Sequence, residues 1–123
     1  DASPGMKYRH YAPKADVKIV EGSFDAFRAF IGRQKGEGVF AIVFDGEETL
    51  LPVQALPFGA EDDPAAQAHL LFDLLRECDE RGAKEVYVRS PRTTGIGLAV
   101  YNRLLRAAAF QIVHLDESGV AAQ

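Results

Sequence analysis

The segment from Arg89 to Gly97 combines residue types that can bind an anion. It reads Arg-Ser-Pro-Arg-Thr-Thr-Gly-Ile-Gly, between a stretch typical of a β-strand and one typical of a helix. In parallel α/β sheets, the N–H groups and the dipole of such a helix face a ligand at the carboxyl end of the strand. The candidate anion site therefore consists of Arg89, Arg92, Thr93, Thr94, Gly95 and Gly97.

This loop lacks residues that the established nucleotide-binding motifs require. Gly95 and Gly97 are not followed by the third glycine of the dinucleotide fingerprint, and no lysine of the Walker type comes after them. The plainer interpretation is that the loop only caps and packs the helix. Both interpretations stay open from the sequence.

Other residues with catalytic or ligating potential do not form a recognisable set. The three histidines, His10, His69 and His114, lack metal-ligand spacing and a paired nucleophile. The one cysteine, Cys78, falls on the apolar stripe of a predicted helix, so we expect it to be buried and unreactive. The acidic run at 61–63 is typical of a helix N-terminus. We therefore predict no metal site.

The leading segment Met6–Tyr11 alternates cations with aromatic residues, in a stretch with no apolar periodicity. Such a composition can pair with phosphates and stack on a base. A solvated linker would have the same appearance. We call residues 1–16 the arm.

The elements that position these residues follow from hydrophobic periodicity. Continuous apolar runs predict strands at 17–20, 39–44, 85–89 and 111–115, while two prolines allow only a broken edge strand within 49–58. Ser23 predicts one helix start, and Asp62 or Asp63 before Pro64 predicts a second, for a helix that ends near Gly82. A third helix follows Gly95.

Strands that alternate with helices predict an α/β fold. We expect a small Rossmann-like domain with a mainly parallel sheet of 4–5 strands and helices on both faces, preceded by an extended N-terminal arm. The predicted division is an interdomain linker at 1–16, the domain at 17–116 and a frayed tail at 117–123.

The composition argues against two kinds of partner, nucleic acid and membranes. The 123 residues carry a formal net charge of −4, which disfavours direct binding of nucleic acid. The apolar runs are shorter than the roughly 20 residues that span a membrane, and a single cysteine is typical of a reducing compartment. We therefore expect a cytoplasmic protein without a membrane segment.

The stretch from Ser3 to Pro13 reads Ser-Pro-Gly-Met-Lys-Tyr-Arg-His-Tyr-Ala-Pro. It resembles the linker signature that joins the two domains of long-form threonylcarbamoyl-AMP synthases. The predicted β/α body, and the segment from Gly95 to Arg106 in particular, is similar to the small C-terminal domain of that family. The resemblance spans nearly the whole chain and is more specific in the linker.

The resemblance implies a parent enzyme that makes threonylcarbamoyl-adenylate from L-threonine, bicarbonate and ATP with Mg²⁺, for tRNA threonylcarbamoyladenosine. It places the chemistry in an N-terminal catalytic domain, which would be the main partner. The chain itself would be non-catalytic and hold no cofactor, with the arm crossing the mouth of the active site. An alternative is a regulatory nucleotide-binding or protein-interaction module that uses the Arg89–Gly97 loop, with other tRNA-modification proteins as partners.

By position, the resemblance assigns roles within the arm. Tyr11 is the leading candidate for nucleotide contact, and Lys7, Arg9 and His10 would meet phosphate or carboxylate oxygens. Tyr8 and Met6 would line the apolar side, and Ser3, Pro4 and Gly5 would form the turn that lets the arm reverse. We expect the arm not to be ordered against its own domain.

Overall fold

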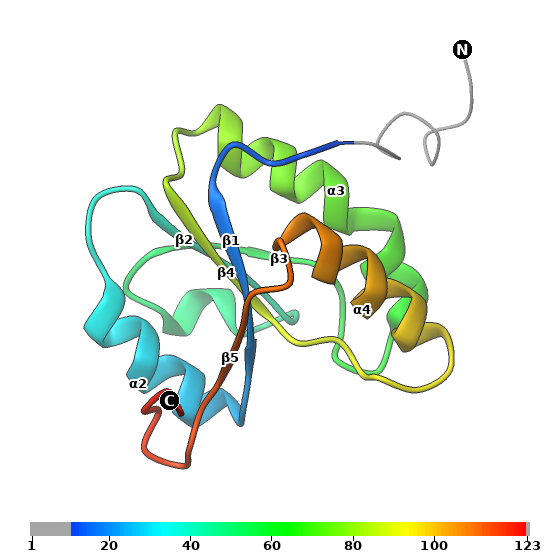
Figure 1. Ribbon diagram of the computed structural model, residues 1–123. Helices are drawn as coiled ribbons and strands as arrows, with labels where there is room; N and C mark the ends of the chain where they lie inside the picture. Colours follow the sequence, from blue (N-terminus) through cyan, green and yellow to red (C-terminus); the bar gives the residue numbers. More distant parts are fainter. Residues whose placement is uncertain (1–10, 123) are drawn as a thin grey trace.

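The computed structural model describes residues 11–122, which form a parallel sheet covered by helices on both faces (Figure 1). The elements in chain order are β1 (Asp16–Glu21), α2 (Phe24–Gln34), β2 (Val39–Val43), the 3-10 helix η1 (Glu48–Leu50), β3 (Gln54–Pro57), α3 (Pro64–Glu80), β4 (Glu85–Arg89), α4 (Ile96–Ala107) and β5 (Ile112–His114).

Two helices begin at the residues that the sequence predicts, and a side chain caps each of them. The Ser23 hydroxyl accepts a hydrogen bond from the Ala26 N–H at 3.1 Å, and the Asp63 carboxylate accepts one from the Ala66 N–H at 3.1 Å. These bonds satisfy N–H groups that have no partner within the first helical turn. Helix α4 begins differently, because Gly95 at its N-cap offers no side chain.

The five strands pair side by side in the order β3-β2-β4-β1-β5, and every pairing is parallel. The carboxyl ends of all strands therefore lie at one edge of the sheet and their amino ends at the other. The two-proline stretch supplies the edge strand β3, as proline's missing N–H requires. The α/β class and the parallel sheet are confirmed.

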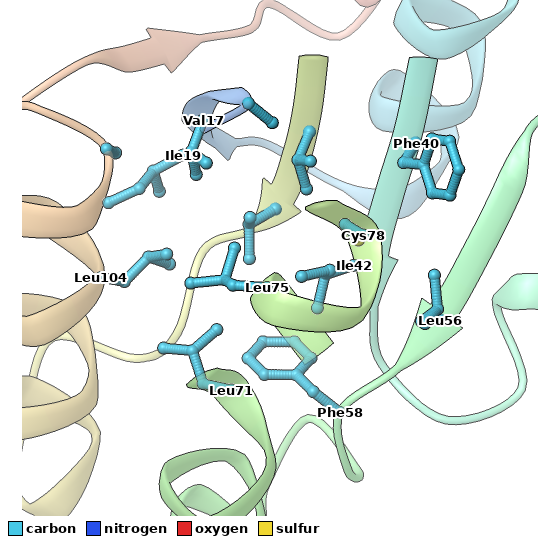
Figure 2. Close-up of a cluster of buried hydrophobic side chains, with 14 of the residues drawn as sticks. Val17, Ile19, Phe40, Ile42, Leu56, Phe58, Leu71, Leu75, Cys78 and Leu104 are labelled. Atoms are coloured by element: carbon cyan, nitrogen blue, oxygen red, sulfur yellow. The ribbon is translucent and has the colours of Figure 1, made fainter. Parts of the chain in front are cut away.

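Two apolar cores lie on the two faces of the sheet. On one face, α3 and α4 pack over Ile19, Ile42 and neighbouring strand residues, as Figure 2 shows for Leu71, Leu75 and Leu104. On the other face, α2 packs over Val20, Ala41, Val43 and Tyr87 through residues that include Phe27 and Ile31. Each fully buried side chain of this size contributes about 1.5–3 kcal/mol.

The C-terminal residues, for which fraying is expected from the sequence, fold back onto the domain through Ala122. The Asp116 carboxylate accepts the N–H groups of Ser118 and Val120, and the Ala122 N–H donates to the His114 carbonyl at 2.8 Å. The Arg33 guanidinium binds the Gly119 carbonyl. Specific turn and side-chain bonds replace the expected fraying there.

No helix within the described part of the chain is both long and apolar enough to span a membrane.

Candidate functional site

An open pocket of about 470 Å³ lies where β1 and β4 end. Its walls are formed by Glu21, Gly22, Phe44, Glu61 and the segment from Arg89 to Thr94. The fold thus brings four residues of the candidate anion site to one hollow, together with acidic side chains from elsewhere in the chain. Gly95 and Gly97 are not part of the wall.

Arg89 already has protein partners for its charge. Its Nε and Nη2 donate to the two carboxylate oxygens of Glu47 at 3.1 and 3.3 Å, and its Nη1 donates to the Gly22 carbonyl at 2.8 Å. The guanidinium also lies over the rings of Phe24, Phe27 and Phe44, 5.1–5.8 Å from their centroids. Arg89 therefore joins the ends of β1, β2 and β4, and Arg92 is the cation of the loop that remains exposed.

The glycines of the loop have structural roles. Gly95 has φ of +59°, the left-handed region that other residues adopt at a cost. A Cβ on Gly97 would lie 2.5 Å from the Arg92 carbonyl oxygen, so the first turn of α4 packs directly on the loop. This geometry agrees with the packing interpretation of the loop, while anion binding stays a prediction.

The charged side chains that line the pocket do not favour an anion. They are Glu21, Glu61, Arg89 and Arg92. Because Arg89 is already paired with Glu47, two carboxylates and the guanidinium of Arg92 remain to act on a ligand. A phosphate in the pocket would therefore gain little from these charges.

Glu21 also organises a small polar cluster at the pocket's rim. His114 Nδ1 lies 2.8 Å from one carboxylate oxygen of Glu21, and the Tyr101 hydroxyl donates to the other at 3.5 Å. Burial and the Glu21 charge raise the pKa of Tyr101. Residues 11–122 hold no group of three or more acidic, histidine or cysteine side chains that could bind a metal ion.

Cys78 agrees with its sequence interpretation. Cys78 is buried among the α3 core residues, and burial raises the pKa of its thiol to about 12, so the reactive thiolate is suppressed. His69 is exposed on α3.

A second polar centre lies at the opposite end of the sheet, where the arm joins the domain. The carboxylate of Asp79, in the last turn of α3, accepts hydrogen bonds from the Tyr11 hydroxyl and the Lys14 N–H through Oδ2, the latter at 2.9 Å. Its Oδ1 accepts the Ala15 N–H at 3.0 Å. We call Tyr11 to Ala15 the arm root.

The electrostatics of this contact favour an ionised Asp79. Burial alone would raise the pKa of its carboxyl, but hydrogen bonds from Tyr11, Lys14 and Ala15 bring it below its ordinary value. Burial, followed by the bond to Asp79, raises the pKa of the Tyr11 phenol. The Tyr11 ring packs against the core on the α3 side, which differs for this residue from the expectation that the arm does not order on its own domain.

Asp79 is the residue that sequence analysis missed. It lies between Glu77 and Glu80 near the end of a predicted helix, where a carboxylate is expected to be exposed to solvent. The signal that could have found it is topological. β1 pairs with β4 from Asp16 opposite Glu85, so the helix before β4 must end beside the chain that enters β1.

The remaining predicted arm residues lie outside the described residues. These are Ser3, Pro4, Gly5, Met6, Lys7, Tyr8, Arg9 and His10. Their assigned roles stay predictions, as does nucleotide contact by Tyr11.

Comparison with known proteins identifies the family. Residues 1–109 match the family described as threonylcarbamoyl-AMP synthase, C-terminal domain. The chain belongs to this family. The match includes the arm and the elements from β1 to α4, and it ends before β5.

Individual relatives agree with this assignment. The chain is 36% identical to the threonylcarbamoyl-AMP synthase of Pyrococcus abyssi and 35% identical to that of Bacillus subtilis, over 90% of this chain and 33% of each relative. Among solved structures, a crystal structure of P. abyssi Sua5 complexed with L-threonine is similar, with a TM-score of 0.67, 32% identity, and coverage of 93% of this chain and 34% of that chain. The chain thus spans about a third of the length of the relatives that it matches.

Proposed function

We propose that this chain is the gating linker and non-catalytic C-terminal domain of an enzyme that makes threonylcarbamoyl-adenylate. The reaction joins L-threonine, bicarbonate and ATP and releases pyrophosphate, as a step toward tRNA threonylcarbamoyladenosine. Catalysis belongs to an N-terminal domain, the main partner of this chain. Cytoplasmic location and contact with other tRNA-modification proteins are part of the same proposal.

One observation carries the gating role: the C-terminal end of the arm is attached to the domain. Tyr11, which ends the Met6–Tyr11 segment, binds Asp79, and the residues that follow lead into β1. An acyl-adenylate is lost if water reaches it, so a segment that closes over the active site protects it. A linker that is fixed where it joins the C-terminal domain has a limited range of positions over the active site.

The chemistry of the arm suits this role. Lys7, Arg9 and His10 offer donors for phosphate and carboxylate oxygens, and aromatic side chains of the same segment can cover a base. The Mg²⁺ that accompanies ATP does not fit residues 11–122, which lack a group of three ligating side chains, so no step is assigned to it here.

The test uses the full-length enzyme with Lys7, Arg9 and His10 replaced together by alanine. Pyrophosphate release and the division of adenylate between bound and free are measured after mixing with ATP, threonine and bicarbonate. We expect the free fraction to rise by at least about tenfold, because hydrogen bonds to charged groups contribute about 1.5–3 kcal/mol each.

A matched control removes three exposed cations of the domain, Arg28, Lys35 and Arg103, by the same substitution. This control should keep the wild-type division of adenylate. Equal retention of adenylate by the arm variant and the control variant would refute the gating role.

The pocket at the carboxyl ends supports a second candidate, a regulatory site for a nucleotide. Arg92, Thr93 and Thr94 face a volume of about 470 Å³, enough for a small ligand. The surrounding acidic residues weaken this candidate. Titration of the full-length enzyme with ATP should then show one class of sites, unchanged by Arg92→Ala; a second saturable class that this substitution abolishes would establish the regulatory site.

A further inference from the structure

The sheet topology places the end of α3 against the entry of the arm. β1 and β4 are neighbours and start in register, with Asp16 opposite Glu85. The Asp16 N–H also donates to the Lys84 carbonyl at 2.8 Å. Because α3 leads into β4, its last turn and the residues before β1 must lie at the same edge of the sheet (Figure 1).

One carboxylate collects three donors there. Asp79 accepts the Tyr11 hydroxyl, the Lys14 N–H and the Ala15 N–H, and both of its oxygens are used. Bonds to an ionised acceptor are roughly twice as strong as neutral ones. Two of the donors are backbone groups, so the contact fixes the path of the chain itself.

Packing supports the same fixation. Ala15 is 8% exposed and belongs to the core beneath α3 and α4, and the Tyr11 ring packs against that core. Between them, Pro13 has a restricted φ. The arm root is thus tied at both ends and stiffened in the middle.

We propose that Asp79 is the positioning residue of the arm: it fixes the arm root on the domain and so sets where the preceding residues can reach. This inference rests on the proposed gating function. Without Asp79, only the packing of Ala15 and of the Tyr11 ring holds the arm root on the domain. If the arm root detaches as far as Ala15, the chain gains about four residues, or roughly 13 Å, of reach. A closing segment with that freedom spends less time in the protective geometry.

The Tyr11 hydroxyl belongs to the anchor in this arrangement. A tyrosine that acted directly on the nucleotide would instead affect ATP affinity independently of Asp79. The two roles are separable, because only the anchoring role predicts that Tyr11 and Asp79 variants behave alike.

The experiment compares Asp79→Asn, Tyr11→Phe and their combination in the full-length enzyme, with Asp73→Asn as the control. Asp73 is an exposed carboxylate on the same helix. Asparagine keeps one acceptor oxygen, loses the negative charge and replaces the other oxygen with an NH₂ group, which cannot accept from these donors. Hydrogen exchange followed by mass spectrometry should show faster exchange in peptides covering residues 11–16, on the order of tenfold for Asp79→Asn and less for Tyr11→Phe.

Activity provides the second readout. We expect Asp79→Asn to raise the free fraction of adenylate several-fold with little change in KM for ATP, and the double variant to behave like Asp79→Asn alone. Tyr11→Phe removes one hydroxyl and keeps the ring, so it remains informative even if Asp79→Asn folds poorly. Asp73→Asn should match the wild type in both measurements.

Three outcomes would overturn the inference. Unchanged exchange at the arm root in Asp79→Asn would show that this carboxylate does not hold it. Faster exchange with unchanged adenylate retention would show that holding it is irrelevant to the reaction. A raised KM for ATP in Tyr11→Phe alone would place Tyr11 at the nucleotide.

Failure of the proposed function is distinguishable from failure of this inference. The proposed gating function is tested by the variant that lacks Lys7, Arg9 and His10. The anchoring role of Asp79 is tested separately, by hydrogen exchange in peptides covering residues 11–16. If that variant retains adenylate normally while Asp79→Asn loosens the arm root, the gating function fails and the anchor remains a structural fact.

Discussion

Replacing Glu47 by alanine removes the carboxylate that neutralises the guanidinium of Arg89. The side chain of Arg89 is 6% exposed and that of Glu47 is 16% exposed, so little water can take over the lost interaction. Glu47 also accepts the Phe44 N–H at 3.1 Å, and this bond disappears in the same variant. Arg89 keeps the Gly22 carbonyl and the nearby phenyl rings.

The expected loss follows from these contacts. Removing one partner of a buried ion pair costs about 3–5 kcal/mol, and the contacts that Arg89 retains place this variant near 3 kcal/mol. With an m-value of about 1.5 kcal/mol per M urea, the unfolding midpoint should fall by roughly 2 M. Urea unfolding followed by far-ultraviolet circular dichroism measures this shift.

Two further variants test the reasoning. Glu61→Ala removes an exposed carboxylate from the same pocket and should change stability by less than about 0.5 kcal/mol. The double variant Glu47→Leu with Arg89→Met removes both charges and should lie closer to the wild type than the sum of the single variants. A cost below about 1 kcal/mol for Glu47→Ala, or additive single effects, would refute a buried, coupled pair.

Three further predictions follow from other contacts. Gly97→Ala should destabilise the protein by about 1–3 kcal/mol in urea unfolding, because the added Cβ would meet the Arg92 carbonyl. Gly32→Ala has nothing within 4 Å of its Cβ and should stabilise the protein by about 0.5–1 kcal/mol. Stability changes of the same sign in the two variants would contradict this packing. The pKa of Asp79 is lowered in the fold, so the stability that its carboxylate contributes is present above about pH 4 and is lost as the pH falls through the folded pKa. The difference in unfolding free energy between the wild type and Asp79→Asn should therefore shrink in acid. A difference that grows in acid would contradict the lowered pKa. Cys78 should resist a thiol reagent in the native protein and react on unfolding, whereas rapid native labelling would show that α3 opens.

The sequence predicted most of the elements because their determinants are local. Ser23 caps the helix that it was expected to start, and of the two candidates Asp62 and Asp63 it is Asp63 that caps the next helix. The two-proline stretch forms only an edge strand. Continuous apolar runs become strands that are covered on both faces, such as Val39–Val43. Each of these inferences needs only neighbours along the chain.

The sites were less predictable because their contacts are distant in the sequence. Arg89 looked like a ligand-binding cation until the fold brought Glu47 to it, 42 residues away. From the sequence, Asp79 has the pattern of an exposed helix carboxylate, and its donors in the arm root lie more than 60 positions earlier in the chain. The folded-back C-terminus likewise depends on Arg33, which no tail pattern reveals.

The parallel sheet gives this domain two chemically different ends. The arm root lies at the amino end and the acidic pocket at the carboxyl end, separated by the six residues of β1, about 20 Å. A dye attached through a cysteine at exposed Thr93 would therefore report on the pocket while leaving the arm undisturbed. Since the native thiol is buried, such a dye could be introduced without first removing Cys78.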